Sequence, residues 1–243
     1  WQLEMRRTHK ADPTPGTYNS SIEVFESVDG ARLAISSEWF KAYQDLDNLP
    51  IFLDESCNIG EECECHEGMH INADGLYVVF RVEDRYVRCT HCGYQADVYK
   101  DACAEFFVQP RADKGYFNFE MNCGGTLLLY HIRDPRRTPE GFADFDPVAA
   151  EQAQKVRVYH SLPARVEPEI EEPVEWFLEY SIPLSLFEPY IGERPRPAGE
   201  RWRGNFYKCG DETSHPHWAS WSPIGAELNF HCPEHFGVLE FAE

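Results

Sequence analysis

Residues 98–121 constrain the fold of this chain most strongly, because two runs of alternating apolar and polar residues flank a short turn. Ala104, Phe106 and Val108 occupy every second position of the first run, and the second run repeats the pattern. Side chains on a strand point alternately to the two faces of a sheet, so each run predicts a strand with one apolar face. Gly115 ends the turn and is free to adopt positive φ, which favours a β-hairpin.

The other face of this hairpin is polar. Glu105, Asn118 and Glu120 share it, and Tyr99 lies just upstream. Carboxyl and amide groups on one face, next to an aromatic ring, could bind a ligand rich in hydroxyl groups. The alternative is an ordinary solvated face, since antiparallel sheets commonly leave one face in water.

The remaining chain is also typical of short strands. The clearest is 75–84, where Leu76, Val78, Phe80 and Val82 share one face. Weaker strands are expected at 22–25, 31–35, 126–131, 155–160, 175–182, 203–209 and 237–241. Helical spacing favours a helix at 36–46 and helical turns at 148–154 and 183–187. Long loops are expected at 134–154, 162–173, 188–200 and 210–234.

These elements predict an all-β fold. Sixteen glycines, seventeen prolines and an aromatic content of 14% suit many short strands with frequent turns. About ten antiparallel strands without βαβ alternation, with one or two short helices, indicate a β-sandwich or jelly roll. At 243 residues, the whole of 1–243 is expected to form one domain.

The net charge of −20 argues against two classes of partner. Nucleic acids bind through Lys and Arg that neutralise phosphates, and anionic membrane surfaces also attract basic proteins. No apolar run is long enough to span a bilayer, and no signal peptide is recognised at Trp1. We therefore expect a mature or trimmed chain that binds neither nucleic acid nor the membrane interior.

The nine cysteines leave several alternatives open. Those at 57–65 lie in a predicted loop, and Cys89 and Cys92 follow one strand later. Disulfides between these groups would be usual in a secreted domain. A zinc site is the second alternative, and it would use Cys63, Cys65, His66, Cys89 and Cys92. Free thiols are the third, and an odd count leaves at least one cysteine without an intramolecular disulfide partner.

The predicted loop 210–234 contains two tryptophans, Trp218 and Trp221, outside any strand pattern. Each is either a plug in the core or a platform on which a sugar ring stacks. The C–H face of a sugar packs on an aromatic ring, while its hydroxyls need polar partners. Lys208 and Asp211 lie nearby in sequence and could supply such partners.

Six segments, in order, resemble the carbohydrate-binding module family 9-like domain. They are 99–107 (YKDACAEFF), 116–122 (YFNFEMN), 176–184 (WFLEYSIPL), 203–211 (RGNFYKCGD), 214–224 (SHPHWASWSPI) and 233–241 (PEHFGVLEF). The resemblance extends over about 76–241. The cysteine-rich part at about 57–92 is not part of the family pattern and is interpreted as a local insert.

The resemblance implies a β-sandwich that holds the end of a glucan or xylan chain between two aromatic rings. By position these rings would be Tyr99, six residues before Glu105, and Trp221, which follows Ser220. Asn118 stands where the founding branch of the family has arginine, and Tyr99 stands where it usually has tryptophan. The family also carries structural calcium, for which no ligands are assigned here because no loop has a recognisable ligand spacing.

We therefore expect a non-catalytic module that binds an oligosaccharide or polysaccharide. The expected ligand-binding residues are Tyr99, Glu105, Asn118, Lys208, Asp211, Trp218 and Trp221. The expected location is secreted, periplasmic or at the cell surface, in association with a larger glycan-degrading enzyme or system.

Three rival activities are less favoured. A glycoside hydrolase would use Glu105 and Glu120 as a carboxyl pair. Haem-dependent electron transfer would need a Met and His pair, for which Met69, His70 and Met121 are candidates. A zinc-dependent activity would use the histidines of the 210–234 loop, which are His215, His217 and His231.

Overall fold

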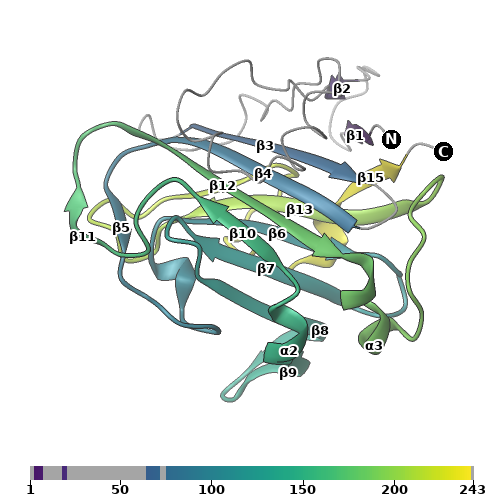
Figure 1. The fold of residues 1–243 in the computed structure, drawn as a ribbon. Helices are drawn as coiled ribbons and strands as arrows, with labels where there is room; N and C mark the ends of the chain where they lie inside the picture. Colours follow the sequence, from purple (N-terminus) through teal and green to yellow (C-terminus); the bar gives the residue numbers. More distant parts are fainter. Residues whose placement is uncertain (1–2, 8–17, 21–63, 72–74, 242–243) are drawn as a thin grey trace.

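A computed structural model describes residues 3–7, 18–20, 64–71 and 75–241. All of its strands except β5 and β11 form two sheets that pack face to face (Figure 1). The large sheet has the order β2-β1-β15-β13-β6-β7-β8-β9, with β14 paired to β13, and the small sheet has the order β10-β12-β4-β3. Every strand pairing among the described residues is antiparallel. The predicted all-β sandwich is confirmed.

The strands of the large sheet are β1 (Leu3–Arg7), β2 (Tyr18–Ser20), β6 (Cys103–Gln109), β7 (Tyr116–Asn122), β8 (Leu127–Thr138), β9 (Gly141–Pro147), β13 (Arg201–Cys209), β14 (Trp218–Ser220) and β15 (Gly237–Phe241). Those of the small sheet are β3 (Glu64–Ile71), β4 (Gly75–Asp84), β10 (Arg157–His160) and β12 (Val174–Pro183). A separate pair joins β5 (Val87–Cys89) to β11 (Val166–Ile170). The described helices are α2 (Ala150–Ala153), α3 (Glu188–Ile191) and the 3₁₀ helices η2 (Val98–Lys100), η3 (Leu184–Leu186) and η4 (Pro233–His235).

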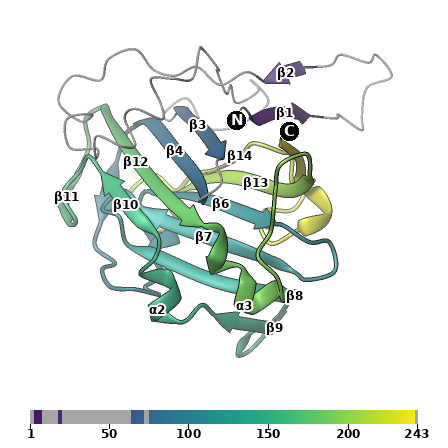
Figure 2. The same ribbon diagram turned by 45° about the vertical axis from the view of Figure 1, so that its right-hand side comes forward.

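The turned view in Figure 2 shows the small sheet lying over the large one, and the core side chains lie between them. Phe106 and Phe119, opposite each other on β6 and β7, are fully buried there. From the small sheet, Phe80 packs edge-on against Phe206 at 6.0 Å between ring centroids. Tyr180 stacks with Phe119 at 6.4 Å. Alternation therefore places the apolar face of the β6–β7 hairpin inward, as the sequence predicted.

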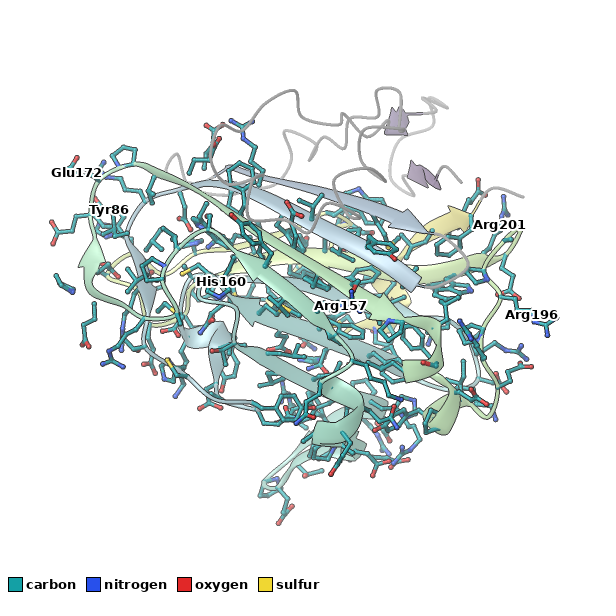
Figure 3. The ribbon with its side chains drawn as sticks, viewed as in Figure 1. Tyr86, Arg157, His160, Glu172, Arg196 and Arg201 are labelled. Carbon is teal, nitrogen blue, oxygen red and sulfur yellow. The ribbon has the colours of Figure 1, made fainter. Side chains whose placement is uncertain are left out.

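The two ends of the sandwich carry different groups. Figure 3 shows Tyr86 and Glu172 at the end near β11, and Arg196 and Arg201 at the opposite end. Tyr86 stacks on His215 with ring centroids 3.6 Å apart, which fixes part of the loop between β13 and β14. The described helices are too short and too polar for any of them to cross a bilayer.

Four predicted loops contain strands in the structure. The predicted loop 210–234 contains β14, which pairs with β13. β8 continues to Thr138 and turns into β9, so most of the predicted loop 134–154 is a hairpin, followed by α2 near the predicted helical turn. The predicted loop 162–173 contains β11. Cys65 and His66 lie in β3, where they pair with Val82 and Arg81 of β4. In each case a long-range strand partner overrides the local turn signals.

The predicted helix 36–46, the weak strands at 22–25 and 31–35, and Cys57 and Cys63 lie outside the described residues. Within them, Cys89 and Cys92 are free thiols, so the expected disulfides from these two residues are not formed. Each thiol instead donates to the carbonyl oxygen of Ala164, at 3.4 and 3.5 Å.

Candidate ligand-binding site

A pocket of about 490 Å³ lies on the outer face of the large sheet, opposite the core. Its volume falls in the range typical of small-molecule sites, roughly 300–1,000 Å³. Five residues expected from the sequence line it together, and these are Tyr99, Glu105, Asn118, Asp211 and Trp218. The polar face of the β6–β7 hairpin is therefore the floor of a pocket, and not a solvated surface.

Strand register builds the polar floor. Glu105 on β6 is directly opposite Glu120 on β7, and both are nearly inaccessible to solvent. Asn118 donates from Nδ2 to Glu120 Oε1 at 2.7 Å, and its Oδ1 accepts from the backbone N–H of Tyr130 at 2.6 Å. The amide is thus held in one orientation, and the Glu120 carboxyl is held by the amide.

Burial sets the charge of this floor. It raises the pKa of Glu105 well above the ordinary value, and Cys209 and Glu120 beside it add to the effect. Burial also raises the pKa of Glu120 to about 7, although the Asn118 hydrogen bond and Arg137 oppose the shift. Below about pH 7 both carboxyl groups are therefore protonated, and they can donate as well as accept hydrogen bonds.

Two aromatic side chains line the pocket from different loops. Tyr99 comes from η2, and Trp218 begins β14 with 37% of its surface exposed. The Tyr99 carbonyl accepts from the backbone N–H of Asp211 at 3.0 Å, which ties the two loops together. Trp218 donates from Nε1 to Asp211 Oδ1 at 2.7 Å, so Asp211 orients the indole ring.

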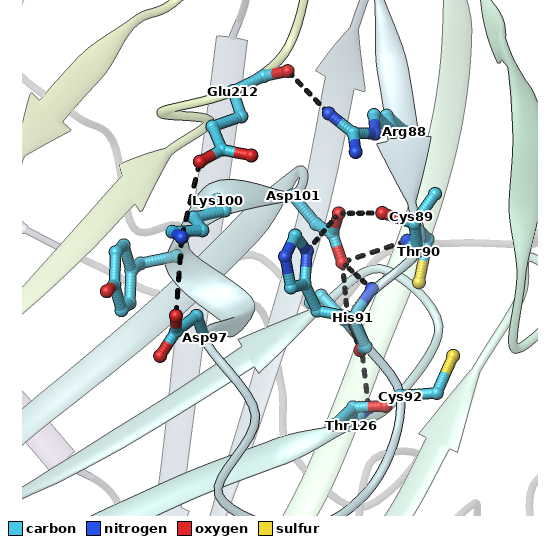
Figure 4. Close-up of polar contacts among 12 residues, drawn as sticks. Arg88, Cys89, Thr90, His91, Cys92, Asp97, Lys100, Asp101, Thr126 and Glu212 are labelled. Atoms are coloured by element: carbon cyan, nitrogen blue, oxygen red, sulfur yellow. Dashed lines mark hydrogen bonds and ion pairs between the residues drawn. The ribbon is translucent and has the colours of Figure 1, made fainter.

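A buried carboxylate anchors η2, as Figure 4 shows. Asp101 accepts from the backbone N–H groups of Thr90 and His91, at 3.0 and 2.8 Å, and from the Asn122 amide at 2.9 Å. Lys100 then bridges Asp97 and Glu212, each at 3.3 Å. These contacts fix the backbone on both sides of Tyr99, so the ring has a rigid support.

The far wall was not predicted from the sequence. The β8–β9 hairpin contributes Arg137, Phe142 and Phe145, and the loop after β14 contributes Phe230 and His231. Phe230 stacks on Tyr207 at 4.1 Å between centroids. The wall residues of the β8–β9 hairpin were missed because 134–154 was interpreted as a loop, although Phe142 and Phe145 gave a weak apolar signal. Phe230 was missed because it lies in the predicted loop 210–234, and His231 was considered only as a zinc ligand.

His231 is a neutral part of this wall. Burial, with Arg137 nearby, lowers its pKa to about 3. Its Nδ1 lies 2.8 Å from the Tyr116 hydroxyl, and its Nε2 lies 4.0 Å from Glu120 Oε1. Because the imidazole is uncharged over the physiological range, it forms no ion pair with Glu120.

Trp221 is a correction to the sequence prediction. It is 2% exposed and belongs to the main core, where its ring meets Phe206 edge-on at 5.9 Å. Gly237 leaves room for it, because a Cβ there would come within 2.2 Å of the indole. β14 pairs with β13 so that Trp218 is opposite Cys209, and Trp221, three residues later, falls on the inner face. The core-plug alternative holds for this residue.

Lys208 is a second correction. It is 1% exposed and points inward, where its Nζ lies 3.2 Å from Asp84 Oδ2 of the small sheet and 2.6 Å from His217 Nε2. Burial alone would raise the pKa of Asp84, but Lys208, His217 and the Trp176 indole hold it below its ordinary value. Lys208 therefore joins the sheets and does not reach the pocket. The sequence did contain a signal of this orientation. Lys208 is two residues from the core residue Phe206, and residues two apart on a strand share a face.

The other rival sites involve residues with different surroundings. Met69 and Met121 are buried in the main core, and the side chain of His70 lies outside the described part of the chain. Of the three histidines proposed for zinc, His215 stacks on Tyr86, His217 contacts Lys208 and His231 lines the pocket. Among the described residues, the one compact group of potential metal ligands is Cys103, Glu105 and Cys209, whose two thiols do not suit calcium. Structural calcium stays a prediction.

Comparisons with known proteins bear on this geometry. The family model described as carbohydrate-binding family 9 matches residues 68–241. A crystal structure from Bacteroides uniformis, of a protein to which carbohydrate binding has been ascribed, shares 32% sequence identity at a TM-score of 0.66. That match covers 78% of this chain and 82% of the other. No protein with curated annotation matches the chain.

Two structures of a family 9 carbohydrate-binding module from Caldicellulosiruptor kristjanssonii are more distant. The complex with cellotriose has 12% identity and a TM-score of 0.49, covering 78% of this chain and 86% of that one. The complex with glucose has 11% identity and a TM-score of 0.45, covering 72% and 75%. The family model covers most of the chain, and the Bacteroides uniformis protein is similar over most of its length. The chain belongs to the carbohydrate-binding family 9.

Proposed function

We propose that this protein binds the end of a neutral oligosaccharide or polysaccharide, without cleaving it, in the pocket on the outer face of the large sheet. One observation carries the proposal. Aromatic side chains from two tied loops and a hairpin surround a floor of three buried hydrogen-bonding side chains in a single pocket. A sugar ring has the matching chemistry, with C–H faces for the rings and hydroxyls for the floor.

Tyr99 and Trp218 are the proposed stacking residues. Trp218 takes the stacking role that the sequence had assigned to Trp221. Glu105, Asn118 and Glu120 are the proposed partners of the sugar hydroxyls. Walls from η2, the β8–β9 hairpin and the loop after β14 surround the floor, which favours a chain end over the middle of a long chain. The net charge of −20 disfavours acidic glycans, so neutral glucan or xylan fragments are the first ligands to test.

The alternative is glycoside hydrolysis, and one observation favours it. Glu105 and Glu120 are a directly opposed carboxyl pair, and the pKa of Glu120 is about 7. The family model that matches the chain is that of carbohydrate-binding family 9, which supports binding over catalysis.

Calorimetric titration tests the proposal. Gluco- and xylo-oligosaccharides are titrated intact and after chemical reduction of the reducing end. Saturable binding to the intact sugars supports the proposal, and its loss on reduction identifies the reducing end as the part bound. Binding that grows with chain length and ignores reduction would replace the chain-end proposal with an internal site.

Two variants connect binding to the pocket. Trp218→Ala is expected to weaken binding, and Tyr94→Ala is the matched control, since Tyr94 is 38% exposed and does not line the pocket. Equal affinity in both variants would move the site elsewhere. Release of shorter sugars during the titration, and its loss in Glu120→Gln, would establish hydrolysis instead.

A further inference from the structure

Two cysteines and one carboxyl converge beneath the pocket. Cys103 on β6 is directly opposite Cys209 on β13, and Glu105 lies two residues further along β6 on the same face. The Cys209 thiol donates to Glu105 Oε1 at 3.1 Å, and the Cys103 thiol lies 3.9 Å from the same oxygen. All three side chains are buried, and their potential ligand atoms lie within 4.8 Å of one another.

We propose that Cys103, Glu105 and Cys209 bind one divalent ion of the zinc class. Zinc prefers thiolate and carboxylate ligands in a tetrahedron, with Zn–S near 2.3 Å and Zn–O near 2.0 Å. Those lengths place a ligating sulfur and oxygen about 3.5 Å apart. The two observed sulfur–oxygen distances, 3.1 and 3.9 Å, lie on either side of this value. A hard ion such as calcium would reject the thiols.

The cluster buries three polar groups, and the S–H donors of its two thiols are weak. On binding, the two thiol protons and the carboxyl proton pass to solvent, and two thiolates and one carboxylate surround the dication.

The fourth position of the ion faces the pocket, because both Glu105 and Cys209 line it. Zinc sites with three protein ligands keep such a position for water or another ligand. If the proposed function is correct, a sugar hydroxyl would take the place of this water. That last step alone depends on sugar binding, whereas the site itself rests on the three side chains.

A disulfide between Cys103 and Cys209 is the competing chemistry. It would remove two electrons and two protons from the pair, and would therefore need an oxidant such as a peroxide. In the structure both residues are free thiols, and both approach the same oxygen of Glu105. This arrangement favours shared ligation of an ion over a sulfur–sulfur bond.

The first experiment measures the metal content of the full chain, purified under reducing conditions and equilibrated with zinc. Cys103→Ala with Cys209→Ala is the test variant. Cys89→Ala with Cys92→Ala is the control, since those cysteines belong to the other zinc alternative. We expect the test variant to lose one equivalent of zinc that the control retains. A test variant that binds as much zinc as the wild-type chain would overturn the proposal.

Two further measurements keep the test decisive if the double variant unfolds. Cobalt added to the wild-type chain should produce a thiolate-to-cobalt charge-transfer band, and Glu105→Gln should weaken cobalt binding by more than about 10-fold while keeping both thiols. Unchanged cobalt binding in Glu105→Gln contradicts the proposal. So does a Cys103–Cys209 disulfide in peptide mass spectra of protein purified without oxidant.

Sugar titration of the zinc-loaded and chelated forms separates this proposal from the proposed function. One equivalent of zinc at this cluster, with no binding of any sugar, supports the metal site and refutes sugar binding. Sugar binding by a chain that takes up no zinc at this cluster supports the proposed function and refutes the metal site. A shift of the cobalt spectrum on adding a bound sugar would place the sugar at the fourth position.

Discussion

The two faces of the β6–β7 hairpin are equally buried but chemically opposite. Phe106 and Phe119 on the inner face are fully buried in an apolar core. Glu105 and Glu120, one residue along each strand, are 2% and 4% exposed on the outer face. Burial of the apolar face stabilises the fold, whereas burial of carboxyl groups costs free energy unless hydrogen bonds replace water. Such a cost is typical of a functional site.

The same contrast separates two tryptophans three residues apart. Trp221 is 2% exposed and fills the core, while Trp218 is 37% exposed and lines the pocket. An odd spacing along an extended chain places side chains on opposite faces. We therefore expect changes on the inner face to affect stability and changes on the outer face to affect binding.

The largest effect is expected for Trp221→Ala. Removing a buried indole should lower the free energy of unfolding by about 3–5 kcal/mol, because a cavity opens in the core. Sugar affinity of the folded fraction should stay unchanged. Denaturant unfolding measures the free energy of unfolding, and calorimetric titration at low temperature measures the sugar affinity. A stable Trp221→Ala protein that has lost its affinity for sugar would show that Trp221 is a binding residue and not a core residue.

Lys208→Met should be nearly as destabilising, by about 3 kcal/mol, because it leaves Asp84 buried without its cationic partner. Adding Asp84→Asn to this variant should recover much of the loss. Thermal and denaturant unfolding of the two single variants and the double variant give the interaction energy. Additive losses would mean that the cross-sheet pair contributes nothing of its own.

Trp218→Ala is expected to reduce the free energy of sugar binding by about 1–3 kcal/mol, as for other aromatic contacts at binding sites. Its stability should change little, because the ring is partly in solvent. Titration and melting curves of the variant, beside Tyr94→Ala, check both parts. A drop in melting temperature comparable to that of Trp221→Ala would erase the distinction between the two faces.

The smallest effect concerns pH. The folded-state pKa of Glu120, about 7, lies above the ordinary value of 4.5. The folded state therefore holds a proton that the unfolded chain loses, and stability falls as the pH rises from about 5 to about 7. Glu120→Gln removes this dependence. The free energy of unfolding of the variant, relative to that of the wild type, should therefore rise by about 1–2 kcal/mol across that window. Melting curves at several pH values measure it, and a constant difference would contradict the raised pKa.

Local sequence patterns predicted much of the fold and part of the site. Alternation identified β4, β6, β7 and β12, and it grouped Glu105, Asn118 and Glu120 on one face with Tyr99 nearby. Asp211 and Trp218 also proved to line the same pocket. The β8–β9 hairpin was missed because its prolines and charges resemble a loop, and its pairing depends on residues of the neighbouring strand.

By itself the sequence determined which side chains share a face, because that follows from the period of two along a strand. It also carried the family, through six ordered segments. Only the tertiary structure decided which faces are covered. The register of β14 on β13 places Trp221 on the inner face, and Lys208 forms an ion pair with Asp84 of the other sheet. Covering a face requires partners distant in sequence, and a pattern of period two contains no information about them.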